Sequence, residues 1–282
     1  MSTSTITPAP GAHLASVSLE KGSPPVIVAV SNYVPGVGEL VVRVKACGVN
    51  PGDIVYPYVG FPSSLPMICG ADVVGIVRKV GAGVQGFVAG DRVAGYSPLH
   101  WSMQKHIEDG PAFFINGDIL KPDNKYGGFQ EQTVMLARGC IKVPTLTIEQ
   151  AATLGCGFST AGEAFWNALH YPRPSKQSTN HGTLLVWGGS GSIGAYAIQF
   201  AKLAGIRVIT AASPRHREYL LSIGAENVFD YNDPKAVEKK EGVENVLDTV
   251  SKVETTQACL EVLQGSKWEG KKKIAITLFM KP

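Results

Sequence analysis

Hydrophobic positions follow two different patterns along the chain, with the change near Thr147. From about residue 26 to residue 142, short valine-rich segments are broken by glycine and proline, as in ELVVRVKACGVN at 39–50. Alternating apolar and polar positions between glycine turns predict half-buried strands that form a small barrel. Beyond Thr147 the apolar spacing becomes helical and then switches repeatedly between strand-like and helix-like segments.

The second pattern predicts a doubly wound parallel sheet, because strands that alternate with helices need crossover connections. The expected strands are the apolar runs at 184–187, 206–212, 226–231, 244–250 and 271–280. Helix starts are indicated by Thr147 with Gln150, Ser213 before Pro214, Asp233 before Pro234, and Ser251 with Glu254. We therefore expect an α/β chain with a β-rich domain at 1–146 and a parallel-sheet domain at 147–282.

A glycine-rich turn, GGSGSIG at 188–194, joins the first parallel strand to the following helix. Gly189, Gly191 and Gly194 have the G-x-G-x-x-G spacing, which lets backbone N–H groups approach an anion at a helix N-terminus. An ordinary glycine loop without a ligand is the alternative. The strand–turn–helix context favours a nucleotide diphosphate.

The end of the second parallel strand bears on which dinucleotide is bound. NAD-selective sheets carry Asp or Glu there, which binds the ribose 2′-hydroxyl. Here Ala212 and Ser213 occupy that place and are followed by Arg215, His216 and Arg217. A guanidinium beside a helix N-terminus suits a 2′-phosphate, so we expect NADPH rather than NADH. A solvated basic first turn is the alternative, although basic groups there oppose the helix dipole.

Composition excludes several classes of protein. The 282 residues are 44% hydrophobic and 17% charged, which is ordinary for a globular chain of two domains. A formal charge of +3 is too small to indicate nucleic acid or an anionic membrane as partner. The start of the chain lacks the pattern of a signal peptide, and the five scattered cysteines favour reduced thiols. We expect a cytoplasmic protein without a membrane span.

Several motifs together resemble the medium-chain dehydrogenase/reductase superfamily. They are GVNPGD at 48–53, CGADVVGIVRKVG at 69–81, GDRVAGY at 90–96, and the glycine turn with TAASPR at 210–215. The resemblance extends over residues 34–280 and is greatest to the zinc-independent branch, namely quinone oxidoreductases and fungal trans-acting enoyl reductases. It implies a GroES-like catalytic domain followed by a Rossmann NADP-binding domain.

The same resemblance implies a set of site residues. Asn50 and Asp53 would lie at the nicotinamide end of the cleft, although both are also common turn formers. Thr160 would meet the cofactor, or alternatively lie on a helix surface, and Tyr231 would border the adenosine or merely end a strand. The residues expected to bind the cofactor are Thr160, Gly189, Ser190, Gly191, Ser192, Ile193, Gly194, Ser213, Arg215, His216 and Tyr231.

The residues at the zinc-ligand positions of the superfamily differ in this chain. Zinc-dependent relatives have a cysteine where this chain has Asn50, and a His-Glu pair where it has Ala71 and Asp72. The four-cysteine structural lobe expected between Gly90 and Cys140 contains no cysteine. Zinc prefers thiolate and imidazole ligands, so we expect no metal.

Two departures from the family pattern affect the expected chemistry. Many enoyl reductases of this branch have Lys or Tyr where this chain has Val55, which leaves Tyr56 either as proton donor or as an aromatic wall. The chain also ends at Pro282, where relatives continue for several dozen residues. We therefore expect either a truncated paralogue or an imperfect gene model. The protein is expected to be a monomer or a homodimer.

Without a Lewis acid, hydride transfer is easiest to a carbon whose charge can spread onto a distant oxygen. This favours NADPH-dependent reduction of a small-molecule α,β-unsaturated carbonyl, with Asn50, Asp53 and Tyr56 as the candidate catalytic residues. A quinone acceptor is the second possibility. A protein that binds NADPH without catalysing a reaction is a third, of a different class.

Overall fold

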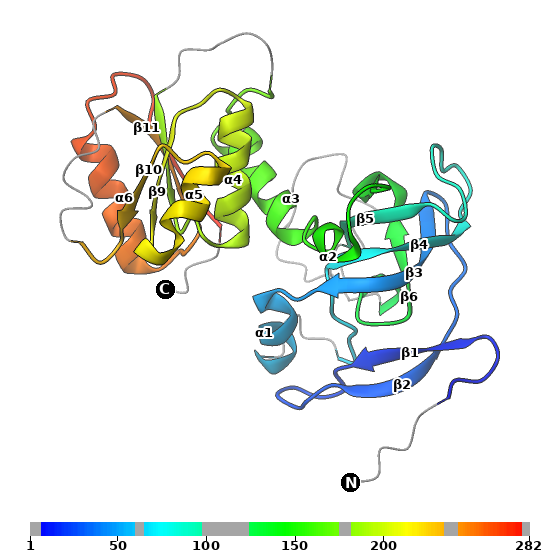
Figure 1. Ribbon diagram of the computed structural model, residues 1–282. Coiled ribbons are helices and arrows are strands. Elements are labelled where there is room, and N and C mark those ends of the chain that lie inside the picture. Colours follow the sequence, from blue (N-terminus) through cyan, green and yellow to red (C-terminus); the bar gives the residue numbers. More distant parts are fainter. Residues whose placement is uncertain (1–6, 60–64, 98–123, 175–181, 234–241, 278–282) are drawn as a thin grey trace. The chain divides into compact units, whose positions relative to one another are not determined.

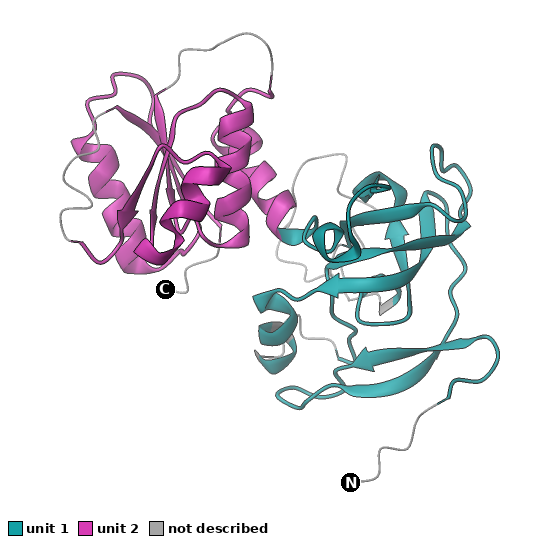
Figure 2. Cartoon of the chain, viewed as in Figure 1, with its two compact units in different colours: residues 1–156 teal, residues 157–282 magenta. Residues whose placement is uncertain are grey.

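The computed structural model describes residues 7–59, 65–97, 124–174, 182–233 and 242–277 (Figure 1). The chain divides into two compact units, Met1–Cys156 and Gly157–Pro282 (Figure 2). The division lies after the change of pattern at Thr147, because helix α2 (Ile148–Ala151) and the residue that follows it pack on the first unit. Ala151 and Ala152 are buried there with Val74 and Ala94.

The first unit is built on a five-stranded antiparallel sheet with the order β6-β3-β4-β5-β7. Its strands are β3 (Glu39–Gly48), β4 (Asp72–Val80), β5 (Arg92–Tyr96), β6 (Gln132–Leu136) and β7 (Cys140–Lys142). A separate antiparallel pair is formed by β1 (Ala12–Val17) and β2 (Val26–Ser31). The described helices are α1 (Pro51–Val59), the single turns η2 (Asn124–Tyr126) and η3 (Ala137–Gly139), and α2. Valine and leucine side chains of β3, β4 and β5 bury one face of the sheet, which explains the valine-rich repeats.

The buried carboxylate of Glu39 joins the start of β3 to the turn η2. Its Oε1 atom accepts hydrogen bonds from Tyr126 Oη at 2.5 Å and from Lys125 Nζ at 3.0 Å. Its Oε2 atom accepts the Gly36 backbone N–H at 2.7 Å. Burial acts to raise the pKa of Glu39, but the hydrogen bonds from Tyr126, Gly36 and Lys125 outweigh it and hold the pKa below its ordinary value.

The second unit is a five-stranded parallel sheet with the order β10-β9-β8-β11-β12. Its strands are β8 (Thr183–Trp187), β9 (Val208–Ala212), β10 (Asn227–Asp230), β11 (Val243–Asp248) and β12 (Lys273–Ile276). The helical segments are α3 (Cys156–Gly162), the π-helical η4 (Glu163–Ala168), α4 (Ser192–Leu203), η5 (Pro214–His216), α5 (Arg217–Ile223) and α6 (Val253–Gly265). The expected α/β fold with a parallel sheet is confirmed.

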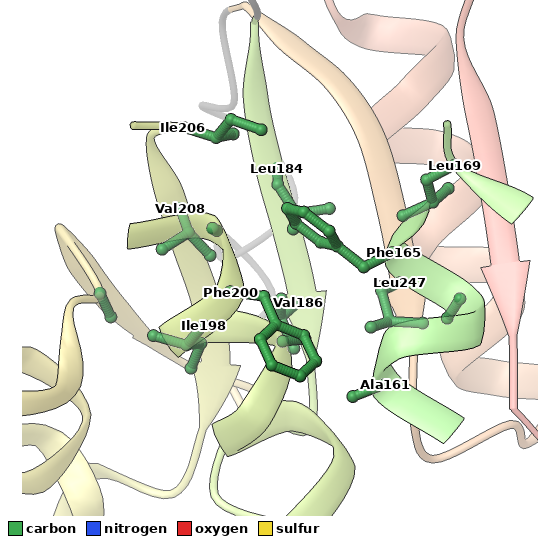
Figure 3. Packing of buried hydrophobic residues seen from close by; sticks show 14 of the residues in the cluster. Ala161, Phe165, Leu169, Leu184, Val186, Ile198, Phe200, Ile206, Val208 and Leu247 are labelled. Atoms are coloured by element: carbon green, nitrogen blue, oxygen red, sulfur yellow. The ribbon is translucent and has the colours of Figure 1, made fainter. Parts of the chain in front are cut away.

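Helices cover both faces of the parallel sheet, as successive residues of β8 demonstrate. Leu184 and Val186 pack into one core, where Phe165 and Phe200 lie beside them (Figure 3). Leu185 and Trp187 belong to a second core with side chains from α6. Both faces of a strand are therefore buried, which is why this segment is a continuous apolar run rather than an alternating one.

One predicted helix start is correct and another is wrong. Thr147 and Gln150 form the expected capping box at α2, with backbone N–H to side-chain contacts in both directions. At α6 the predicted box of Ser251 and Glu254 is absent. There Lys252 is the N-cap, and its N–H donates to Thr255 Oγ1 at 3.0 Å.

The carboxylate of Asp248, at the end of β11, explains why the predicted box is absent. Asp248 accepts the N–H groups of Val250 and Ser251, and also the hydroxyls of Thr255 and Thr256. Ser251 is consequently held at φ 58°, a left-handed conformation that is incompatible with capping the helix. A further helix start, predicted at Asp233–Pro234, lies at the edge of the described residues, and its helix lies outside them.

Replacing the buried carboxylate tests its contribution to the first unit. Glu39→Gln removes the charge from three hydrogen bonds and is expected to lower the free energy of unfolding by about 1–3 kcal/mol near neutral pH. Because the folded-state pKa of Glu39 is depressed, its contribution is present above about pH 4.5 and is lost as the pH falls through the folded pKa. Urea unfolding of wild type and variant at about pH 7.5 and about pH 4 measures both effects.

Glu131→Gln is the matched control, because this exposed carboxylate accepts only the Leu14 N–H in the described part of the chain. It is expected to change stability by less than about 0.5 kcal/mol. An equal loss for Glu39→Gln at both pH values would contradict the charge-based explanation.

Candidate active site

The turn between β8 and α4 brings strand and helix backbones close together. Gly188 has φ +86°, and a Cβ on Gly194 would lie 2.5 Å from the Gly188 carbonyl oxygen. A Cβ on Gly189 would overlap the hydroxyl of Thr210 on β9. These glycines are therefore required by packing alone, whatever the turn binds.

Gly191 is different, because its surroundings are open. The nearest atom to a Cβ built there is the Gly188 carbonyl oxygen at an ordinary 3.6 Å. Gly191 is the N-cap of the twelve-residue helix α4, no side chain caps this end, and Ser190, Gly191 and Ser192 are exposed. The first N–H groups of an α-helix have no partner within the helix. They can bind an anion here, with a favourable helix dipole.

The second parallel strand ends at this same edge of the sheet. Gly188 N donates to the Ala211 carbonyl at 2.9 Å, which places the glycine turn beside the end of β9. Ser213 is the N-cap of η5, with Pro214 at its first position, as the sequence predicts. Arg215 is exposed, and its Nε donates to His216 Nε2 at 3.0 Å, so the proton of a neutral His216 is assigned to Nδ1.

Arg217 is engaged elsewhere. Its Nη1 atom donates to the Val228 carbonyl at 2.8 Å and fixes the start of α5 to β10. The parallel register pairs Ala212 with Asp230, so Tyr231 follows beside Ser213, and it is 52% exposed. The structure thus gathers the glycine turn, Ser213–His216 and Tyr231 at the carboxyl edge of the sheet, which is where doubly wound sheets bind ligands.

Helix α3 also approaches the glycine turn. A Cβ on Gly157 would lie 2.9 Å from the Cβ and Oγ atoms of Ser192, so the two helices meet closely at this point. Thr160 lies one turn further along α3 and is half-buried. The expected cofactor residues of the second unit therefore lie around one short stretch of backbone.

The predicted residues of the first unit lie around the N-terminus of α1. Asn50 N donates to Asp53 Oδ2 at 2.8 Å, and Gly70 N donates to Asp53 Oδ1 at 2.9 Å. Asp53 is only 5% exposed, and burial raises its pKa against the opposing hydrogen bonds from Asn50 and Gly70. Its carboxylate therefore fixes the Asn50 turn, and a direct role in the reaction stays a prediction. Tyr56 lies within α1, but its side chain is outside the description.

A cavity of about 320 Å³ adjoins this turn within the first unit. It lies between α1 and the β1–β2 connection, and its wall is mainly apolar, with proline, isoleucine, tyrosine and phenylalanine side chains. Asp53 and Cys69 form part of it. The cavity and the Asn50 turn therefore share the Asp53 carboxylate.

Asp72 is the residue whose role the sequence reasoning missed. It begins β4, is 6% exposed, and its Oδ1 accepts the Cys156 backbone N–H at 2.5 Å. Burial raises the pKa of Asp72 to about 6, against hydrogen bonds from Cys156 and Asn50, and the charge of Asp53 raises it further. The available signal was an acid at the start of an otherwise apolar strand, ADVVGIV at 71–77.

Two further observations concern metals and membranes. Among the residues whose positions are described, no group of three or more His, Cys, Asp or Glu is placed to hold a metal ion. Within the same residues, no helix has the length and apolar character needed to cross a bilayer.

Comparisons with known proteins agree with this geometry. Residues 36–145 match the family model "Alcohol dehydrogenase GroES-like domain", and residues 192–266 match "Zinc-binding dehydrogenase". The chain is 35% identical over 223 residues to trans-enoyl reductase ACTTS2 of Alternaria alternata, covering 75% of this chain and 58% of that protein. It is 30% identical over 275 residues to trans-enoyl reductase tazE of Aspergillus terreus, covering 93% and 85%.

A thermostable alcohol dehydrogenase from Pyrobaculum aerophilum has a similar structure, with a TM-score of 0.70 and 26% identity over 96% of this chain and 78% of that one. The match to ACTTS2 spans little more than half of that relative, whereas the match to tazE spans most of it. Fold, site geometry and relatives lead to one conclusion. The chain belongs to the medium-chain dehydrogenase/reductase family.

Proposed function

We propose that this protein is an NADPH-dependent reductase of α,β-unsaturated carbonyl compounds. The observation that carries the proposal is the open helix N-terminus at Gly191 beside a strand end that presents Arg215 and His216 instead of an acid. The similarity to fungal trans-enoyl reductases, at 30–35% identity, supports an activated double bond as the reacting group.

The residues present fit a dinucleotide phosphate. Gly191 has open space around it and no side chain, Ser190 and Ser192 beside it are exposed, and Ile193 is half-buried. The backbone N–H groups of Ser190–Ile193 are therefore proposed to bind the diphosphate. Arg215 and His216 would bind a 2′-phosphate, and Tyr231 would border the adenosine. Thr160 would contact the cofactor from α3. When bound, the cofactor supplies the hydride that is transferred.

The residues around Asn50 determine which acceptor is suitable. Asn50, Ala71 and Asp72 stand where zinc-dependent relatives have their ligands, and this set offers neither thiolate nor imidazole. We therefore propose catalysis without zinc. A conjugated carbonyl needs only hydrogen-bond donors for its developing enolate and a proton, for which Asn50 and Tyr56 are the proposed sources.

The apolar cavity beside Asp53 supports a substrate with an apolar acyl part. A quinone is the second candidate acceptor, because the charge that develops when hydride is added to it is also delocalised onto an oxygen.

Two glycine substitutions separate binding from packing at the turn. Gly191→Ala places a methyl group in open space, so the thermal midpoint is expected to fall by only a few degrees while NADPH affinity falls at least about tenfold. Gly194→Ala meets the Gly188 carbonyl and is expected to cost about 1–3 kcal/mol of stability. Thermal unfolding measures the stability of each variant, and fluorescence titration with NADPH measures its affinity. Unchanged NADPH affinity in Gly191→Ala would show that the diphosphate lies elsewhere.

The choice of dinucleotide is tested at the end of β9. Arg215→Ala is expected to weaken NADPH binding by about 10- to 100-fold and to leave NADH binding nearly unchanged, because only NADPH carries the 2′-phosphate. Arg207→Ala is the matched control, since Arg207 precedes β9 at the opposite end and forms an exposed pair with Glu226. Tighter binding of NADH than of NADPH to the wild type would overturn the assignment.

The reaction is tested with one panel of acceptors: short and medium-chain enoyl thioesters, small enones, quinones and primary alcohols. Oxidation of NADPH is expected with the enoyl compounds, unaffected by a chelator, and deuterium from stereospecifically labelled NADPH should appear at the β-carbon. Turnover confined to alcohols and abolished by the chelator would refute the mechanism. NADPH binding without turnover of any acceptor would favour a role in nucleotide binding alone.

A further inference from the structure

Asp72 occupies a space between separate segments of the first unit that two glycines leave open. In the β3–β4 register it lies opposite Gly48, where a Cβ would be 3.0 Å from the Asp72 Cβ. A Cβ on Gly155 would overlap the Asp72 carboxylate itself. The adjacent Cys156 N–H donates to this carboxylate at 2.5 Å. The carboxylate therefore determines how closely the segment before α3 can approach the sheet.

The charge of Asp72 lacks a compensating cation. In the described parts of the chain no lysine or arginine forms an ion pair with it. The titratable groups on the elements around it are Cys47 of β3, Asp53 of α1, Tyr96 of β5 and Cys156 of α3. Burial, followed by the charges of Asp53 and Asp72, raises the pKa of the Cys47 thiol, which therefore stays neutral. A buried acid without a cation lowers stability when it ionises.

The side-chain amide of Asn50 lies between the two buried acids. It acts to lower the pKa values of both Asp53 and Asp72. Its Nδ2 atom is nevertheless buried and forms no hydrogen bond of regular geometry with any described residue. The orientation of this amide is thus governed by two carboxylates, one of which, Asp53, is already fixed by backbone N–H groups.

We propose that Asp72 is a positioning residue, whose ionised carboxylate orients the Asn50 amide and fixes the first residue of α3 for cofactor binding. The proposal rests on the proposed function, in which Asn50 donates to the developing enolate and Thr160 of α3 contacts the cofactor. Protonation of Asp72 weakens it as an acceptor and introduces a donor facing the amide. On this proposal, the ionised Asp72 carboxylate lowers the stability of the fold, and its benefit is the orientation of Asn50 and of the first residue of α3.

This gives opposite pH dependences for function and stability. NADPH affinity is expected to rise with pH as Asp72 ionises and to level off above its folded-state pKa of about 6. The contribution of Asp72 to stability falls as the pH rises, because a raised folded-state pKa means that the folded protein binds this proton more tightly than the unfolded chain. The contribution of Asp72 to stability therefore grows as the pH falls from about 6 towards 3.8, the ordinary pKa of an aspartate.

The test compares Asp72→Asn with wild type, using Asp91→Asn as the matched control. Asp91 is a carboxylate of the same unit that pairs with Lys142 and lies outside the proposed site. Asp72→Asn can still accept the Cys156 N–H, but it presents an NH₂ group to Asn50. Near pH 7.5 it should unfold at the same temperature as wild type or higher, bind NADPH about tenfold more weakly, and lose the acidic limb of the pH profile.

Asp91→Asn should retain the wild-type pH profile of NADPH affinity. Wild-type affinity and an unchanged acidic limb in Asp72→Asn would overturn the proposal. Lower stability of Asp72→Asn near pH 7.5 would also contradict it, because that result indicates an ordinary structural carboxylate.

Nuclear magnetic resonance of the unliganded protein tests the same proposal without any catalytic assay. The ¹⁵N–¹H signals of the Asn50 side-chain amide and the Cys156 backbone amide should titrate together with a midpoint near pH 6 in wild type, and not in Asp72→Asn. If neither signal titrates, the positioning role is wrong even if enoyl thioesters are reduced. If both titrate and no acceptor is reduced, the positioning role is supported and the proposed reaction alone fails.

Discussion

The close approach of two backbones at Gly189 and Gly194 determines the arrangement of the second unit. At these positions the strand–turn–helix connection leaves no room for a Cβ, so α4 begins directly at the edge of the sheet. The Gly188 N–H to Ala211 bond then brings the end of β9 to the same place. Helix α3 packs against Ser192 in turn. Each proposed cofactor contact of this unit depends on that one approach.

In the first unit, buried carboxylates contribute to the arrangement in addition to close packing at glycines. Glu39 is stabilised by a lysine, a tyrosine hydroxyl and a backbone N–H, which together hold its pKa down. Asp53 and Asp72 accept hydrogen bonds but form no ion pair with a lysine or arginine in the part of the chain that the structure describes, and their pKa values are raised. The contrast separates a carboxylate that stabilises the fold from a pair that lowers its stability, and a costly pair is typical of a functional region.

The sequence predicted those features that depend on neighbours along the chain. Long apolar runs identified β8 and β9, and Thr147 with Gln150 identified α2, because strand burial and capping leave local patterns. The start of α6 was mispredicted because Asp248, at the end of the preceding strand, accepts the Ser251 N–H, which the predicted box would give to the Glu254 side chain, and Ser251 is held in a left-handed conformation.

The candidate site likewise has features that local sequence predicts and features that depend on distant segments. The glycine turn and the end of β9 were predicted from spacing, and the structure gathers them at one edge. The position of Asp72 could not be predicted, because it depends on Gly48 and Gly155 converging from segments far apart in the sequence. An isolated acid in an apolar strand carries no information about which backbone groups will reach it.

The complete burial of β8 has a consequence for how this protein can diverge. All five residues of the strand are buried, and its two faces belong to two separate cores. A polar change anywhere on it would be selected against for stability before any effect on ligand preference could matter. Ser190, Ser192 and Arg215, by contrast, are exposed and contribute to neither core. Variation in the proposed cofactor contacts is therefore free to accumulate in the two turns while the strand between the cores stays constant.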